Sequence, residues 1–243
     1  MVSDGGNIMA ILINLITTFF AMIGLRLDRL NLFWIIGAVM TFAFGHYYVI
    51  IANNPGLTLS YFFFTLVFYY FGNGLILSSS IPRLLIANYG EKKAFEIYQT
   101  IVGLMFMNQG LGIAAMTSLD MGANWEISIA SSYTFIFGGI IFMVGMVLKI
   151  WSTMTLGIDL YYYRDMFLNH SVGTFTQSGP YKIFDNPMYG IGQIHGYGYA
   201  IMYQSITGFM AIALCHVLIY VFYYSVERPF VRRVYGELGS LHP

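Results

Sequence analysis

The sequence predicts an all-α, polytopic transmembrane helical bundle of about seven spans that ends in a C-terminal helical hairpin. The first observation is the composition, with 58% hydrophobic and 9% charged residues, where soluble domains carry about 25% charged residues. The second is a series of charge-free apolar runs, each long enough for a helix of about 20 residues to cross a bilayer. The third is the position of the basic residues, which fall between alternate runs. The net charge of zero gives no indication of a nucleic-acid partner.

The first three spans come from two apolar runs. Residues 5–25 contain no charged residue and form the first expected span. The next charge-free run extends from Arg29 to Arg83 and is too long for one helix. The sequence Asn-Asn-Pro-Gly at 53–56 is a strong turn signal near its middle. We therefore expect spans at 31–51 and 58–78.

The remaining spans come from two runs of ordinary length and from one run that is long enough for two helices. Residues 97–118 and 127–148 give the fourth and fifth spans. The last apolar run, 186–226, is too long for one helix. The polar patch Gln-Ser-Ile-Thr-Gly at 204–208 predicts the tip of a helical hairpin in this run. Each arm is then slightly short, close to the lower limit of about 17 residues.

The basic residues test this count, because cytoplasmic loops are enriched in Lys and Arg. With seven spans, all 11 basic residues fall on one side: Arg26, Arg29, Arg83, Lys92, Lys93, Lys149, Arg164, Lys182, Arg228, Arg232 and Arg233. We expect the C-terminus and a loop at 155–188 on the cytosolic or matrix side, and the N-terminus on the other. The pattern allows the endoplasmic reticulum, a mitochondrial membrane or the bacterial inner membrane.

The chain divides by composition into two parts. Residues 1–130 supply N-terminal transmembrane helices. Residues 131–243 form a membrane core that contains the polar, Gly- and Tyr-containing loop 155–188 and the C-terminal segment. A long loop between the last spans is where soluble chemistry would meet the membrane.

The most specific string is Gly-Pro-Tyr-Lys-Ile-Phe-Asp-Asn-Pro-Met-Tyr at 179–189. It is followed by Gly-Tyr-Ala-Ile-Met at 198–202, Ser-Ile-Thr-Gly at 205–208 and Glu-Arg-Pro-Phe at 227–230. In this order and spacing the set resembles the phosphatidylethanolamine (phospholipid) N-methyltransferase family, which is related to the isoprenylcysteine carboxyl methyltransferases. The core Asp-Asn-Pro-Met-Tyr at 185–189 is the phospholipid version. The resemblance covers about residues 140–237.

The resemblance implies an enzyme that transfers a methyl group from S-adenosyl-L-methionine to the amine headgroup of a phospholipid in the bilayer. The family's Gly-x-Gly keeps only its second glycine here, and its Glu-Glu pair keeps only the first acid. Carried over residue by residue, the expected cofactor-binding residues are Gly145, Gly157, Asn186, Pro187, Tyr189, Glu227 and Arg228. The expected catalytic residues are His195 and Glu227.

Each of these positions also has a plainer interpretation. Pro187, preceded by the capping residue Asn186, suits the first turn of a helix. The free N–H groups of that turn can hold the carboxylate of the cofactor, or the two residues simply begin an ordinary helix. Glu227 is an acid at membrane depth, which is usually functional, or a helix-end acid paired with an arginine. His195 follows Tyr189 by about two turns. It can take a proton from the substrate amine or only bond a neighbouring helix.

Two further patterns have a structural and a functional interpretation. The small residues Gly192, Gly196 and Ala200 favour close helix packing over room for a cofactor. The charges of Asp159, Arg164 and Asp165 suit a zwitterionic headgroup or, more simply, a solvated helix end. No group of His, Cys, Asp and Glu has metal-ligand spacing, so we expect no metal.

Three other classes of protein remain open. The altered cofactor motifs allow a catalytically degenerate family member that serves as a structural subunit of a membrane protein complex. A carboxyl methyltransferase of prenylated proteins is disfavoured because Asn186 replaces that family's histidine, and a related sterol reductase would need a nicotinamide-binding pattern. A transporter or channel would need ionisable residues at mid-membrane, where this sequence has almost none.

Overall fold

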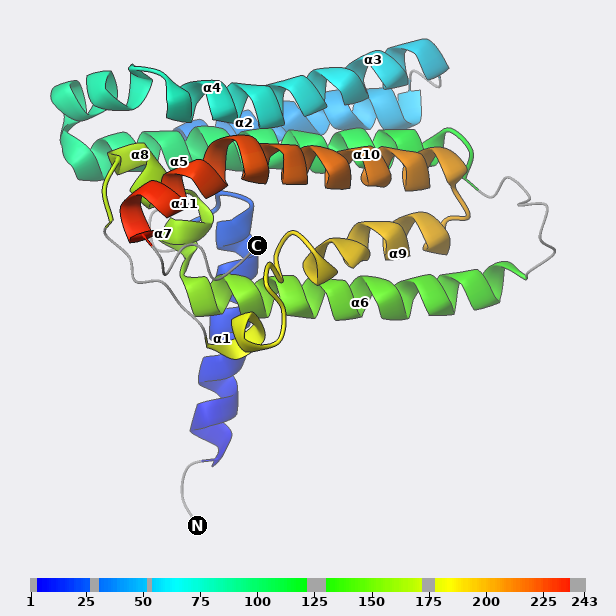
Figure 1. Cartoon of the computed structure of the whole chain (residues 1–243). Helices are drawn as coiled ribbons and strands as arrows, with labels where there is room; N and C mark the ends of the chain where they lie inside the picture. Colours follow the sequence, from blue (N-terminus) through cyan, green and yellow to red (C-terminus); the bar gives the residue numbers. More distant parts are fainter. Residues whose placement is uncertain (1–3, 27–30, 52–53, 122–129, 172–177, 237–243) are drawn as a thin grey trace.

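The computed structural model describes residues 4–26, 31–51, 54–121, 130–171 and 178–236. Within these ranges the chain forms helices and turns, and all the long helices except the first lie along a common direction (Figure 1). The predicted all-α helical bundle is therefore confirmed.

The first half of the chain supplies five α-helices, two of which continue into π-helical turns. They are α1 (Asp4–Met22), α2 (Leu32–His46) with η1 (Tyr47–Ile51), α3 (Pro55–Leu66) with η2 (Val67–Phe71), α4 (Gly72–Ser78) and α5 (Ile81–Ser118). The second half begins with the long α6 and then has shorter pieces. They are α6 (Ser131–Leu156), α7 (Ile158–Tyr161), α8 (Arg164–Leu168), η3 (Gly179–Lys182), η4 (Ile191–Gln193), α9 (Ile194–Met202), α10 (Ile206–Phe222), η5 (Tyr223–Glu227) and α11 (Arg228–Tyr235).

Five of the seven expected spans coincide with described helices that are long and apolar enough to cross a membrane: Leu32–Val49, Pro55–Ser78, Ile81–Ser118, Ser131–Leu156 and Ile206–Tyr235. The helix α1, expected as the first span, runs across the direction of the bundle (Figure 1). The helix α9 has nine residues and rises only about 14 Å. The hairpin of α9 and α10 is present, but its first arm is too short to span.

Local sequence explains where the helices begin and bend. Asn54 caps α3, because its side-chain oxygen accepts bonds from the backbone N–H groups of Gly56 (2.9 Å) and Leu57 (3.2 Å). Pro55 stands at the first helical position, where its missing N–H leaves no bond unmade. Gly90 has φ 74° and ψ 159°, so α5 kinks at a residue that tolerates positive φ.

The core joins residues that are distant in the sequence. Tyr98 of α5 is fully buried, stacks on Phe167 of α8 with ring centroids 4.7 Å apart, and donates to Asn73 Oδ1 at 2.8 Å. Tyr162, between α7 and α8, is also buried, and its hydroxyl donates to the carbonyls of Ala21 (3.0 Å) and Met22 (2.9 Å). The segment expected as a polar loop at 155–188 therefore packs partly into the core.

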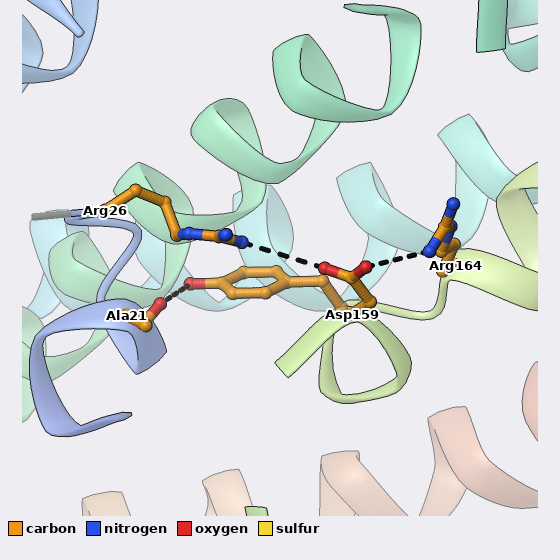
Figure 2. A network of polar contacts seen from close by, with 5 residues as sticks. Ala21, Arg26, Asp159 and Arg164 are labelled. Atoms are coloured by element: carbon orange, nitrogen blue, oxygen red, sulfur yellow. Dashed lines mark hydrogen bonds and ion pairs between the residues drawn. The ribbon is translucent and has the colours of Figure 1, made fainter. Parts of the chain in front are cut away.

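The charges in this segment pair with one another. Figure 2 shows Arg26 and Arg164 reaching Asp159 from opposite sides, at 3.7 Å and 2.9 Å. Asp165 is buried and accepts a hydrogen bond from the hydroxyl of Tyr235. Asp159 is thus part of an ion-pair network that joins the end of α1 to α8, which favours the structural interpretation of these charges.

Basic residues gather at one end of the bundle, where α5 begins and where α8 and α11 lie (Figure 1). Arg29 lies outside the described residues. Lys149 is different from the other described basic residues because it lies inside α6 and is 6% exposed.

Candidate functional site

A non-helical segment enters the bundle between α6 and α10. It extends from Asn186 to η4, and an added Cβ at Gly192 would lie 3.4 Å from Lys149 Cβ. Because Lys149 stands seven residues before the end of α6, this contact is about 10 Å along the helix from that end. Irregular backbone at membrane depth is tolerated where protein buries it or where it lines a cavity.

Tight turns satisfy the backbone of this segment. The N–H groups of Gly190 and Gly192 each donate at 2.8 Å, to the carbonyls of Asn186 and Pro187. The side chain of Asn186 accepts from the N–H of Tyr189 at 3.3 Å. The expectation of a helix beginning at Pro187 is therefore wrong. Pro187 is buried in a turn, and the α-helix begins at Ile194.

Two of the motifs meet at a pair of side chains. The hydroxyl of Tyr189 donates to Glu227 Oε2 at 2.8 Å, and it lies 3.0 Å from the hydroxyl of Tyr163. Tyr163 and Tyr189 are both buried. The Asp-Asn-Pro-Met-Tyr string and the Glu-Arg pair, 38 residues apart, thus form one polar site.

Glu227 is placed by a π-helical turn, η5, between α10 and α11. Pro229 follows in the first turn of α11. Its nitrogen has no hydrogen to donate to the carbonyl four residues earlier, and its ring crowds that carbonyl. A widened turn relieves this conflict, and π-turns within α-helices often occur at functional sites.

Lys149 contributes a buried cation next to this pair. Its Nζ donates to Gln193 Oε1 at 2.9 Å and lies 5.5 Å from the centre of the Phe106 ring. Among the described residues it forms no ion pair with an acid. A cavity of about 30 Å³, enough for a water molecule, lies beside it. The cavity is lined by Tyr69, Tyr70, Phe106, Gln109, Lys149, Tyr161, Tyr163, Met188, Tyr189, Gln193 and Ile219.

Four buried side-chain atoms have no hydrogen-bond partner within the described part of the chain, and two of them are donors in the motif segments. These two are the hydroxyl of Tyr181, in the Gly-Pro-Tyr-Lys turn, and Nε of Arg228, whose guanidinium lies 5.3 Å from the ring of Tyr224. An unpaired buried donor costs about 1–3 kcal/mol, and such groups often await a ligand or water. Both belong to the motif segments that supply Tyr189 and Glu227.

Gly145 and His195 form a separate contact. An added Cβ at Gly145 would stand 2.4 Å from the backbone nitrogen of His195, so this glycine allows α6 and α9 to approach closely. Nδ1 of His195 lies 2.6 Å from the carbonyl of Gly192. No hydrogen bond joins His195 to Tyr189 or Glu227 in the described residues. Gly157, with φ 90° and open space around it, ends α6.

The small-residue stripe on α9 is a packing surface, as expected. An added Cβ would stand 2.2 Å from the Ile212 side chain at Gly196 and 2.7 Å from the Pro187 carbonyl oxygen at Gly192. The site residues that sequence reasoning missed are Tyr163, Tyr181 and Lys149. Tyr181 lies inside the quoted motif, and Lys149 is the one charge in the apolar run 131–156, so both left a signal.

The fold and this site define a polytopic α-helical membrane protein with a polar site at one end of the bundle. The sequence profile of the phospholipid methyltransferase family matches residues 133–238. A relative from Dictyostelium discoideum named phosphatidylethanolamine N-methyltransferase B is 30% identical over 137 residues, which are 56% of this chain and 66% of that protein. Residues 133–238 of the chain thus form a domain of the phospholipid methyltransferase family.

Two yeast relatives, both named phosphatidylethanolamine N-methyltransferase, match over shorter shares of their length. The one from Komagataella phaffii is 23% identical over 149 residues, 60% of this chain and 17% of that protein. The one from Clavispora lusitaniae is 28% identical over 104 residues, 42% of this chain and 12% of that protein. The chain thus spans just under two thirds of the Dictyostelium relative and much less of the yeast ones. No solved structure matches the chain.

Proposed function

We propose that the protein is a membrane methyltransferase that uses S-adenosyl-L-methionine to methylate the amine headgroup of a phospholipid, converting phosphatidylethanolamine towards phosphatidylcholine. The observation that carries this proposal is the hydrogen bond from Tyr189 to Glu227 (2.8 Å). It joins the two strings that resemble the family's motifs. The names of the relatives favour a lipid amine over the carboxyl group of a prenylated protein.

The residues at the site fit the cofactor chemically. Glu227 supplies an acceptor for its amino or ribose groups. Arg228 Nε and the Tyr181 hydroxyl are unpaired buried donors in the described structure and suit its carboxylate. Asn186 and Pro187 shape the turn that holds Tyr189 in place. When bound, the cofactor supplies an electrophilic methyl group, while the protein supplies position and electrostatics.

The lipid amine must lose a proton before it attacks. An amine with a pKa of about 10.4 costs roughly 4–5 kcal/mol to deprotonate at neutral pH. We infer that Glu227 or His195 takes this proton. Because the Gly192 carbonyl can only accept, Nδ1 of His195 donates to it, and this tautomer leaves Nε2 as an acceptor. Gly145 acts by allowing the close approach of α9, which positions His195.

The roles of Gly157 and of the loop follow from their place. At Gly157 the chain turns from α6 into the segment that contains Tyr161, Tyr162 and Tyr163. This turn brings the hydroxyl of Tyr163 within hydrogen-bond distance of the hydroxyl of Tyr189. We propose that the lipid enters laterally from the leaflet at the basic end of the bundle, which is the cytosolic or matrix side.

The test uses purified protein in detergent with ethanolamine phospholipid and labelled S-adenosyl-L-methionine. We expect the wild type to bind the cofactor and transfer methyl groups, and Glu227→Gln and Asn186→Ala to lose most transfer. Tyr224→Phe is a matched control, because Tyr224 lies on the same π-turn but is 50% exposed. Full activity in both site variants would refute the site assignment.

A second outcome would favour the structural-subunit alternative. If the wild-type protein bound no S-adenosyl-L-methionine at millimolar concentration, a family member that lost its cofactor would explain the altered Gly-x-Gly and Glu-Glu motifs. Cofactor binding without transfer to ethanolamine lipids would instead indicate a different acceptor.

A further inference from the structure

A groove of about 510 Å³ lies at the basic end of the bundle, away from the cavity beside Lys149. Its walls come from α4, α5, α8, η5 and α11, and we call it the arginine groove. Its lining residues are Leu77, Ser78, Ser79, Pro82, Arg83, Ile86, Met166, Phe167, Leu168, Asn169, Ser225, Val226, Pro229, Phe230 and Arg233. We propose that the arginine groove binds the phosphate group of a membrane phospholipid.

The charge of the groove favours an anion. Arg83 and Arg233 come from different helices, and none of the lining residues is acidic. Arg233 is held in place, because its guanidinium donates to Asn169 Oδ1 at 2.9 Å and lies 5.6 Å from the centre of the Phe230 ring. Arg83 is exposed and forms no ion pair with a described residue. A planar guanidinium can bind phosphate oxygens through two parallel hydrogen bonds.

The apolar walls of the groove and its place at the ends of helices favour a lipid over free phosphate. Leu77, Ile86 and Phe230 are among the apolar side chains that line the groove. The groove lies where α4 ends and α5 begins, and helix ends lie at the headgroup level of a bilayer. A phospholipid bound here would place its phosphate between the arginines and its glycerol and first chain carbons against the apolar walls.

The groove is separate from the proposed methyl-transfer site. Val226 lines the groove, whereas the next residue, Glu227, bonds to Tyr189. The helix formed by α10, η5 and α11 therefore has the groove on one flank and the site on another. Binding in the groove requires neither the cofactor nor methyl transfer.

The test measures lipid binding to the purified protein in detergent, without cofactor, by native mass spectrometry and by the shift in unfolding midpoint. The probe is dihexanoyl phosphatidylglycerol, with dihexanoylglycerol and inorganic phosphate as comparisons. We expect saturable binding of the phospholipid only. The double variant Arg83→Gln/Arg233→Gln should bind it at least about tenfold more weakly. Arg232→Gln is the matched control, because Arg232 is an exposed arginine on α11 that does not line the groove.

Equal affinity of the double glutamine variant and the wild type would overturn the proposal, and so would equal affinity for inorganic phosphate and for the phospholipid. A second variant guards against misfolding. Arg83→Lys/Arg233→Lys keeps both charges, so it should keep the wild-type unfolding midpoint and bind more tightly than the glutamine variant. Since the assay involves no methyl transfer, its result is independent of the proposed function.

Discussion

Asp120, two residues after the end of α5, caps α10 through Thr207, 87 residues later in the sequence. Oδ1 of Asp120 accepts from the Thr207 hydroxyl at 2.7 Å, and Oδ2 accepts from the Thr207 backbone N–H at 3.0 Å. Ser205 and the N–H of Ile206 donate to the same carboxylate. One side chain thus fixes the tip of the α9–α10 hairpin to the neighbouring helix.

Replacing Asp120 by Asn should lower stability by about 1–2 kcal/mol, as loss of a helix cap does, and the unfolding midpoint measures this. Burial opposes ionisation of Asp120, but its hydrogen bonds outweigh burial and hold its pKa below the ordinary value. The stabilisation is therefore complete above the unfolded pKa of about 3.9 and is lost as the pH falls through the lower folded pKa.

The pH dependence of stability distinguishes the contribution of the Asp120 cap from the loss of stability that acid causes elsewhere in the protein. The wild type should lose stability on acidification, whereas Asp120→Asn should lose less over the same range because it carries no charge to neutralise. Glu91→Gln, an exposed acid on α5, should behave as the wild type. If the unfolding midpoints of Asp120→Asn and the wild type fell in parallel as the pH is lowered, the charge of Asp120 would not contribute to the cap.

Gly145→Ala should destabilise the packing of α6 on α9, because the added Cβ would overlap the backbone of His195. Backbone cannot move as easily as a side-chain tip, so we expect a cost of about 1–3 kcal/mol. Gly139→Ala on the same helix is the control, since nothing lies within 4 Å of its added Cβ. It should be neutral or slightly stabilising. Similar unfolding midpoints for the two variants would disprove the close contact.

Tyr189→Phe keeps the buried ring and removes the hydroxyl that bonds to Glu227 and Tyr163. A neutral hydrogen bond contributes about 1 kcal/mol to stability, so the protein should still fold. If the hydroxyl orients Glu227, kcat for methyl transfer should fall by at least about tenfold, with a smaller change in KM for lipid. Tyr224→Phe should leave kcat unchanged, and an unchanged kcat in Tyr189→Phe as well would remove this tyrosine from the site.

Lys149→Met tests whether the buried cation serves function or folding. Replacing a buried charge by an apolar side chain of similar size is often neutral or stabilising, so we expect an equal or higher unfolding midpoint. Methyl transfer should nevertheless fall by about tenfold or more, because the cavity beside Tyr189 loses its cation. Lys182→Met, at an exposed position, is the control. A stabilised variant with full activity would leave Lys149 without a functional role.

Apolar periodicity and turn chemistry predicted most of the bundle. The turn at 53–56 was visible because Asn54 and Pro55 are a cap and a first-turn residue, and these effects are local. The orientation of α1 was not visible, because it depends on where Tyr162 and Asp159 hold its end. An apolar 19-residue helix looks the same in sequence whether it spans a membrane or crosses a bundle.

The candidate site was predictable in composition but not in geometry. The motif strings identified Tyr189 and Glu227, and the structure joins them. The sequence placed a helix at Pro187, whereas the backbone turns there because Asn186 and Pro187 carbonyls accept from two glycines. Tyr163 reaches the site through tertiary packing, which no local pattern encodes, whereas Lys149 is marked in the sequence as the one charge in the apolar run 131–156.

The hydrogen bonds of the Tyr162 hydroxyl connect the segment that matches the family, residues 133–238, to the N-terminal part of the chain. This hydroxyl is anchored to the last carbonyls of α1, while the neighbouring Tyr163 contacts Tyr189. A fragment beginning at residue 131 would lose that anchor and the Tyr98 surface on which Phe167 stacks. We therefore expect that the methyltransferase-like part does not fold as an autonomous module, and that grafting it onto another membrane anchor would require grafting these contacts with it.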